Sequence, residues 1–361
     1  WNIIDVGHVR DNRHREAIGR MKMCNRLFAG AFALLALIWP VIPVDAQGEP
    51  SGTLLPRTAD GHPDLGGIWD FRTITPLERP VELADQEFLS DEEIAAFEAE
   101  TAVTRNADLN REALAKIVTG RGTVNGTTET RDLALAYNDF WWDRGTQVVG
   151  TKRTSLIVDP SNGRIPSLTA EGERKRSVRQ ALSQRITEGP EDRSVAERCL
   201  LGFNSGPPML PGGYNQNVHL FQTSDYVAIL NEMVHNVRIV PLDGRPHGTL
   251  AQWTGDSRGF WDGDTLVVET KNFRRETSFR GSSKNLNLTE RFTRIDSKTL
   301  LYEFTVEDPT TWMEAWSVEV PMQKSENPMF EYACHEGNYG MEGTLSGARA
   351  LERNQAAGAS R

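Results

Sequence analysis

The chain lacks the sequence patterns of several common enzyme classes. It contains no Gly-x-Ser-x-Gly elbow, and the stretch Gly202-Phe-Asn-Ser-Gly206 does not have that spacing. Glycine-rich phosphate loops and dinucleotide-binding fingerprints are also missing. These absences argue against serine hydrolases of the elbow type and against nucleotide-dependent enzymes. If the protein is an enzyme, we expect it to work without an organic cofactor.

Long runs of one charge are also absent. The first 46 residues hold six of the 40 Lys and Arg residues and four of the 50 Asp and Glu residues, so the remainder carries 34 basic and 46 acidic side chains. Nucleic-acid binding relies on clustered Lys and Arg, which this balance does not provide. We therefore expect no nucleic-acid partner and interpret the net negative charge as a source of solubility.

A long apolar run occurs only near the N-terminus. The first methionine is Met21; two basic residues follow, then the apolar run Leu27 to Pro43, and then Val44 and Ala46 at the positions that a signal peptidase reads. This layout predicts a secretory signal peptide at residues 21–46. A retained membrane anchor is the weaker alternative, because two prolines interrupt a run of only about 17 residues.

Cleavage after the signal peptide defines the expected mature protein. Residues 1–20 then form an upstream translated segment, and residues 47–361 form a single β-rich domain of 315 residues. We expect this domain to be periplasmic or secreted, with no stable membrane anchor and with a small molecule as its partner.

Cysteine is scarce, and only Cys199 and Cys334 remain in the expected mature chain. An even pair in an exported protein favours a disulfide, and closing this 135-residue loop would stabilise the fold by roughly 5 kcal/mol at most. Two separate buried thiols are the alternative. A bridge would bring His335 and Glu336 beside Asn204.

The sequence does contain patterns that are typical of β-strands. Residues 300–307 alternate apolar and mostly polar side chains, and Asp262-Gly263 resembles the tight turn of a hairpin. About ten short strands without strand-helix alternation predict a mainly β, antiparallel fold, either a lipocalin-like barrel or a strongly curved sheet. A two-sheet sandwich is the main rival. Helical segments are expected near residues 88–145 and 167–198.

Two local patterns refine this expectation. Ser90 and Glu93 have the spacing of a capping box at a helix start. The early strand contains Gly67-Ile-Trp69, a Gly-x-Trp pattern followed by antiparallel strands. That pattern resembles the first strand of a lipocalin, whose barrel has room for one small ligand.

A longer resemblance covers about residues 56–347. Its motifs are PDLGGIW, ERCLLGFN, NEMVHNVRIVPLDGRPH and YACHEGNYG. Together they resemble a family of exported bacterial proteins of unassigned function. The resemblance implies an exported single-chain protein and implies no reaction.

The candidate catalytic residues lie in two of these motifs. We expect His235 to transfer a proton, Arg238 or Arg245 to stabilise developing negative charge, and His335 or Glu336 to act as the complementary acid or base. Alternatively, His235 has a structural role and is hydrogen-bonded inside the barrel.

Metal binding is not predicted. Glu232 and His235 are three residues apart, which puts them on one face of a helix but on opposite faces of the strand expected here. His219, His247 and His335 complete a set of four histidines, but their spacing forms no compact zinc motif.

Further polar and aromatic side chains are candidates for substrate binding. His247 lies on a loop after a proline, Trp312 follows an acidic strand end, and Asn338-Tyr339 is either a simple glycine-flanked turn or a ligand contact. The full set is Asn204, Tyr214, Asn217, His219, Arg245, His247, Trp312, Asn338 and Tyr339.

Two functions fit these candidates. The first is an exported hydrolase or lyase that acts on a small carbohydrate-like or aromatic molecule by acid–base chemistry. The second is a periplasmic barrel protein that binds a small apolar or glycosidic ligand without catalysis.

Overall fold

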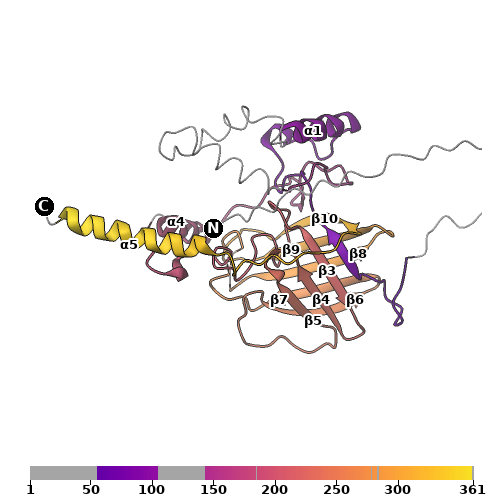
Figure 1. Cartoon of the computed structure of the whole chain (residues 1–361). Coiled ribbons are helices and arrows are strands. Elements are labelled where there is room, and N and C mark those ends of the chain that lie inside the picture. The colour runs from indigo at the N-terminus through magenta and orange to yellow at the C-terminus, as the bar shows by residue number, and fades with distance from the viewer. Residues whose placement is uncertain (1–54, 105–142, 184, 278, 283, 360–361) are drawn as a thin grey trace, which may run out of the picture. The chain divides into compact units, whose positions relative to one another are not determined.

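The computed structural model describes residues 55–104, 143–183, 185–277, 279–282 and 284–359 (Figure 1). The predicted upstream segment and signal peptide, residues 1–46, lie outside the described residues. So do residues 105–142, which make up most of the first segment expected to be helical.

Ten strands and three α-helices are described, with three short 3-10 turns between them. The strands are β1 (Gly67–Asp70), β2 (Ile157–Asp159), β3 (Asn217–Gln222), β4 (Tyr226–Asn231), β5 (Val237–Pro241), β6 (Asp256–Asp262), β7 (Thr265–Lys271), β8 (Asn287–Arg294), β9 (Thr299–Glu307) and β10 (Trp316–Ser325). The helices are α1 (Asp91–Thr104), α4 (Ala170–Ser183) and α5 (Tyr339–Ala359), and the 3-10 turns are Val81–Leu83, Pro190–Asp192 and Met233–His235.

All ten strands belong to one antiparallel sheet, so the prediction of a mainly β fold is confirmed. The order along the sheet is β5-β4-β3-β1-β10-β9-β8-β7-β6, and β2 pairs with one end of β10. A single sheet is the observed arrangement rather than the two sheets of a sandwich. Several of its strands are visible side by side in Figure 1.

The predicted alternation in β9 is present. Leu300, Tyr302, Phe304 and Val306 are buried, while the residues between them are partly exposed. The β6–β7 hairpin is also present, but its two-residue turn is Gly263–Asp264, one residue later than expected. Gly263 has φ +60°, which a glycine adopts without steric cost.

The sheet is rolled rather than flat. Arg238 of β5 forms an ion pair with Glu290 of β8, and these strands are six steps apart in the sheet order. In a flat sheet that separation would be about 29 Å, far more than two side chains span. Side chains of the inner face, including Trp69 and Phe292, fill the interior and are fully buried.

The two edge strands approach each other at Gly259 of β6. A Cβ added to Gly259 would lie 2.7 Å from Leu242 Cδ2 and 2.8 Å from Val240 Cγ1, so a side chain here would collide with the β5 region. Within the described residues, no ladder of hydrogen bonds joins β5 to β6. The strongly curved sheet is therefore consistent with the structure, whereas a closed lipocalin-like barrel is not confirmed.

The helices α1 and α4 lie within the two segments expected to be helical. The predicted capping box at the start of α1 is confirmed, since Ser90 N donates to Glu93 Oε2 at 2.7 Å and Glu93 N donates to Ser90 Oγ at 3.2 Å. The long C-terminal helix α5 was not expected from the sequence. No helix in the described ranges has both the length and the apolar character needed to cross a membrane.

Candidate functional site

A cavity of about 500 Å³ combines apolar walls with two arginines. It is lined by residues 73–77, residues 210–214, Leu156, Phe203, Arg144 and Arg280. These residues come from six separate stretches of the chain. No aspartate or glutamate is among the described residues that line it, so the charged groups in its wall are both cationic.

Residues 73–77 form one wall, and hydrogen bonds hold this segment in place. Thr73 Oγ1 donates to Gln147 O at 2.9 Å, and Val149 N donates to Thr75 Oγ1 at 3.0 Å. Leu156 N donates to Pro76 O at 2.9 Å on the other side of the segment. The threonine hydroxyls are therefore already used to fix the wall.

The opposite wall is a loop rich in glycine and proline. Gly212 N donates to Gln216 Oε1 at 2.8 Å, and Met209 N donates to the buried Tyr302 hydroxyl at 3.0 Å. A Cβ at Gly212 would lie 2.8 Å from the Phe203 ring. Only glycine at this position lets Phe203 pack against the loop, so the loop and the aromatic ring are shaped together.

Arg280 is the charged residue most suited to ligand contact. Its guanidinium makes no hydrogen bond to a described residue, and its backbone lies in the left-handed region at φ +47°. Surrounding protein atoms lower the pKa of Arg280 by desolvation, although the nearby Glu78 carboxylate opposes this. The Arg280 side chain is nonetheless exposed, so an anion in the cavity can reach its charge.

Aromatic side chains surround the same cavity. Phe203 is about half exposed and meets Tyr214 edge-on, with 5.3 Å between ring centroids. The Tyr332 ring is tilted against Tyr214, with 6.1 Å between ring centroids. Asn204 Nδ2 donates to Tyr214 O at 2.9 Å, so this buried candidate residue positions the aromatic cluster.

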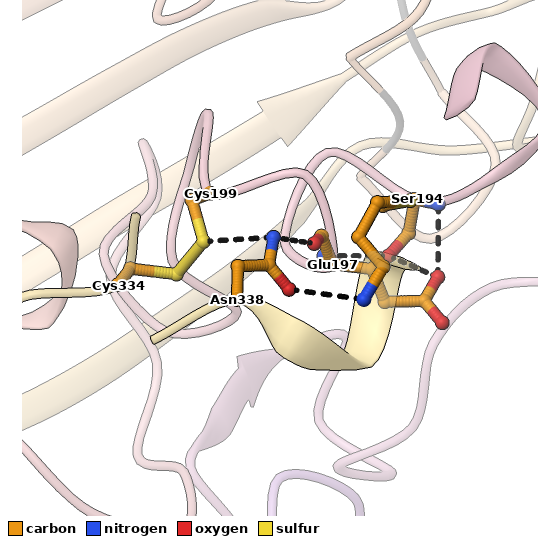
Figure 2. The surroundings of a disulfide bond; sticks show 6 residues. Ser194, Glu197, Cys199, Cys334 and Asn338 are labelled. Carbon is orange, nitrogen blue, oxygen red and sulfur yellow. Dashed lines mark hydrogen bonds between the residues drawn. A yellow bond between two sulfur atoms is a disulfide. The ribbon is translucent and has the colours of Figure 1, made fainter. Parts of the chain in front are cut away.

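The predicted disulfide is present between Cys199 and Cys334, whose Cα atoms are 5.7 Å apart. Figure 2 shows Asn338 next to this bridge: its Nδ2 lies 2.9 Å from Glu197 O and 3.4 Å from Cys199 Sγ. The bridge ties the segment that carries Tyr332 to the segment that carries Phe203. It therefore holds two members of the aromatic cluster in the same region.

Asn338 also caps a helix. Its Oδ1 accepts a hydrogen bond from Met341 N at 3.3 Å, the third residue of α5, as an N-cap residue does. Tyr339 is the first residue of α5, and its side chain is mostly exposed. Asn338 and Tyr339 thus form the start of a helix rather than a simple turn.

The residues predicted to be catalytic are not joined by any described contact. His235, His335 and Glu336 are exposed, whereas Arg238 is buried inside the rolled sheet. The predicted meeting of His235, Arg238 and His335 in one site therefore receives no support from the structure, and their catalytic roles remain predictions.

Arg238 belongs to a buried polar network. Its Nη1 and Nη2 donate to Glu290 Oε2 and Oε1 at 2.6 and 2.8 Å, and the Tyr302 hydroxyl donates to Glu290 Oε1 at 2.8 Å. Burial works against the charge of Arg238, but the Glu290 carboxylate outweighs it and raises the pKa of Arg238. Desolvation, with the Glu290 charge, raises the pKa of Tyr302 far above its usual value. Arg238 could stabilise the negative charge that develops in a reaction only if its ion pair with Glu290 were broken.

The remaining binding candidates are spread over the sheet. Asn217 Nδ2 donates to the buried Glu232 carboxylate at 2.8 Å. His219 packs against Phe221 with ring centroids 3.9 Å apart, and burial lowers the pKa of His219. Trp312 is fully buried and meets the Trp316 ring edge-on, so it belongs to the core rather than to an open binding surface.

Arg245 and His247 lie on the loop after β5. Arg245 is exposed and pairs with Asp243, whose carboxylate raises the pKa of Arg245. His247 Nδ1 lies 3.2 Å from Asp256 Oδ2, and Arg258 Nη1 lies 2.6 Å from Asp256 Oδ1. Of the predicted binding residues, only Tyr214 lines the cavity, and Asn204 is hydrogen-bonded to the Tyr214 backbone.

No group of three or more His, Cys, Asp or Glu side chains in the described part of the chain is arranged to hold a metal ion. The sequence interpretation missed Arg280, Phe203 and Arg144. Arg280 lies in FRGSSKN, a stretch with no chemical motif, and only its position in space brings it to the cavity. Comparison of the chain with family models, curated proteins and solved structures found no match to any of them.

Proposed function

We propose that the protein binds a small molecule that has an aromatic or apolar body and one negatively charged group. The observation that carries this proposal is the cavity of about 500 Å³, which presents two arginines, lacks carboxylates among its described lining residues, and has an aromatic rim. Its volume lies in the range typical of small-molecule sites.

The cavity suggests how such a ligand would be oriented. Its anionic group would contact Arg280, whose exposed guanidinium has no hydrogen-bonded partner among the described residues. Its ring would pack against Phe203 and Tyr214. A guanidinium can bind a carboxylate through two parallel hydrogen bonds. This geometry favours ligands that carry a planar carboxylate.

This proposal places the ligand outside the rolled sheet. A lipocalin-like barrel would hold its ligand inside, but the interior here contains the Arg238–Glu290 pair and fully buried aromatic rings. The disulfide supports a periplasmic or secreted location, because such bonds persist in oxidising compartments. We therefore propose that the protein acts in the periplasm or outside the cell.

A hydrolase or lyase acting on a small carbohydrate-like or aromatic molecule is the second candidate. The observation that favours it is the His247–Asp256 contact, since a carboxylate that orients a histidine is a common arrangement in acid–base catalysis. No histidine is among the described residues that line the cavity. Binding therefore explains the cavity more directly than catalysis does.

Ligand capture from a mixture tests the proposal. The purified protein is incubated with an extract of environmental metabolites, separated from free compounds, and denatured, and the released molecules are identified by mass spectrometry. We expect aromatic or apolar acids from the wild type and at least tenfold less from Arg280→Asn, since asparagine tolerates a positive φ but has no charge.

Arg275→Asn is the matched control, because it removes an exposed arginine from the same segment without touching the cavity. It should capture as much acid as the wild type. Equal capture by wild type and Arg280→Asn would overturn the proposal. New products that appear with the wild type and disappear with His247→Ala would instead favour the enzyme.

A further inference from the structure

A second cavity of about 360 Å³ lies beside α1. The helix contributes Glu93, Ala96, Phe97 and Glu100 to its wall. These residues are spaced i, i+3, i+4 and i+7, so they lie along one face of the helix, with the apolar pair in the middle and a carboxylate at each end. The centre of this wall is therefore apolar.

The rest of the wall is mostly apolar. Its apolar members are Pro76, Pro80, Leu83, Leu89 and Val148, and its polar members are Thr75, Arg153 and Thr154. Leu83 and Leu89 are half-buried, so parts of their side chains remain available to a molecule in the cavity. Burying such surface from water is favourable by about 25 cal/mol per Å².

Hydrogen bonds and an ion pair fasten α1 to this wall. Val148 N donates to Glu98 Oε1 at 2.9 Å, and Lys152 Nζ lies 2.7 Å from Asp91 Oδ1. Leu89 N donates to Lys152 O at 2.8 Å just before the helix begins. The helix is thus held to the segment around Val148 at two points along its length, which fixes the shape of the cavity.

The charges around this cavity differ from those of the first. Its only lining cation among the described residues is Arg153, and the Arg153 Nη2 lies 2.9 Å from Glu87 Oε1, which neutralises the charge. Glu93 and Glu100 leave an excess of negative charge at the rim. Hydrogen bonds from Ser90 and Gln86 lower the pKa of Glu93, so it stays ionised. An anionic ligand would be repelled.

The two cavities share a wall but are separate. Thr75 and Pro76 contribute to both, and their hydrogen bonds to Val149 and Leu156 keep the segment between the cavities in place. A ligand in one cavity therefore does not extend into the other without displacing this segment. Two molecules of different charge can be bound on opposite sides of it.

We infer that the α1 cavity is a second binding site, and that it takes a small, uncharged apolar molecule. The apolar walls supply the binding free energy, and the rim carboxylates exclude the acids that the Arg280 cavity prefers. The inference does not depend on the function proposed for that first cavity.

Fluorescence titration with N-phenylnaphthylamine, an uncharged apolar dye, tests this site in the full chain. Ala96→Trp fills the cavity from an exposed position of α1, and we expect it to weaken dye binding at least tenfold. Ala99→Trp adds the same ring to an exposed helix position that does not line the cavity, and it should bind as the wild type does. Leu83→Gln, which makes the facing wall polar, should also weaken binding.

The Arg280→Asn variant separates this inference from the proposed function. It should keep its affinity for the dye while it loses affinity for acids. Unchanged binding in both Ala96→Trp and Leu83→Gln would overturn the inference, and so would a loss of dye binding in Arg280→Asn. Equal losses in Ala96→Trp and Ala99→Trp would show a general effect on α1 and would overturn it too.

Discussion

At the scale of single residues, burial rather than residue type decides what the charged side chains do. Arg280 and Arg238 have the same guanidinium group. Arg238 is enclosed by the sheet and donates two hydrogen bonds to Glu290, whereas Arg280 lines a cavity without a hydrogen-bonded partner among the described residues. The first stabilises the fold and the second is available to a ligand.

Asp308 provides a residue-scale prediction about pH. Burial opposes its charge, but hydrogen bonds from Ser282, Thr310 and Thr311 prevail and lower the pKa of Asp308 below the usual 3.8. A lowered folded-state pKa stabilises the fold above the unfolded value, and this contribution is lost as the pH falls through the folded value. The free energy of unfolding should therefore decline as the pH falls below 3.8.

Asp308→Asn isolates this effect. It should lower the free energy of unfolding by about 2 kcal/mol at neutral pH, since it exchanges an acceptor for a donor among buried hydroxyls. Its stability should also depend less on pH in the acid range, as measured by urea denaturation. Asp85→Asn removes an exposed carboxylate that makes no hydrogen bond to a described residue and should change neither quantity. If the free energy of unfolding of Asp308→Asn depended on pH as that of the wild type does, Asp308 would not be the source of the acid dependence.

At the scale of elements, the C-terminal helix depends on the residue just before its start. Asn338 caps α5 and also donates to Glu197 O beside the disulfide, as Figure 2 shows. Further along the helix, Arg349 Nη2 donates to Thr187 O at 2.7 Å and Arg349 Nη1 donates to Glu188 O at 2.8 Å. The helix is therefore attached to the segment before Cys199 at both places.

Substitution of the cap should loosen this helix. Asn338→Ala removes the acceptor for Met341 N, and we expect a loss of about 1 kcal/mol in the free energy of unfolding, together with faster proteolysis within α5. Asn338→Asp keeps a cap acceptor but loses the donor to Glu197 O, so it should lose less stability than Asn338→Ala. Equal proteolysis of α5 in wild type and Asn338→Ala would show that the cap is not needed.

Elements with a local signal could be predicted from the sequence. The alternation of β9 and the capping box at Ser90 and Glu93 depend on neighbours in the chain, so the sequence is enough to find them. The disulfide followed from the expected export of the chain and from the cysteine count. Helix α5 was missed because its four glycines gave it a turn-like composition, although Asn338 was a usable cap signal.

Features that depend on distant contacts could not be predicted. In β5, alternation alone would place Val237 and Ile239 inside and Arg238 outside, yet Val237 and Ile239 are about half exposed and Arg238 is buried. The reason is Glu290, 52 residues away, which offers a bidentate partner inside the rolled sheet. The cavity escaped prediction for the same reason, because Arg280 and Phe203 come to line one cavity only in the folded chain.

At the scale of the whole molecule, the Arg238–Glu290 pair connects strands from two parts of the sheet across its interior. Glu290→Gln should destabilise the protein by about 3 to 5 kcal/mol, because it leaves the Arg238 charge buried and uncompensated. Chemical denaturation would measure this loss. The double variant Arg238→Met with Glu290→Leu should lose less than Glu290→Gln alone, since it removes both charges. If Glu290→Gln were as stable as the wild type, the pair would have no role in holding the rolled sheet.

The measurement that tests the central claim most directly is a calorimetric comparison of naphthoate with its uncharged counterpart, naphthylmethanol. If the Arg280 cavity binds aromatic acids, the wild type should bind naphthoate at least tenfold more tightly than naphthylmethanol. Arg280→Asn should abolish that preference, and Arg275→Asn should keep it. Equal affinity of the wild type for both compounds, or an unchanged preference in Arg280→Asn, would contradict the account.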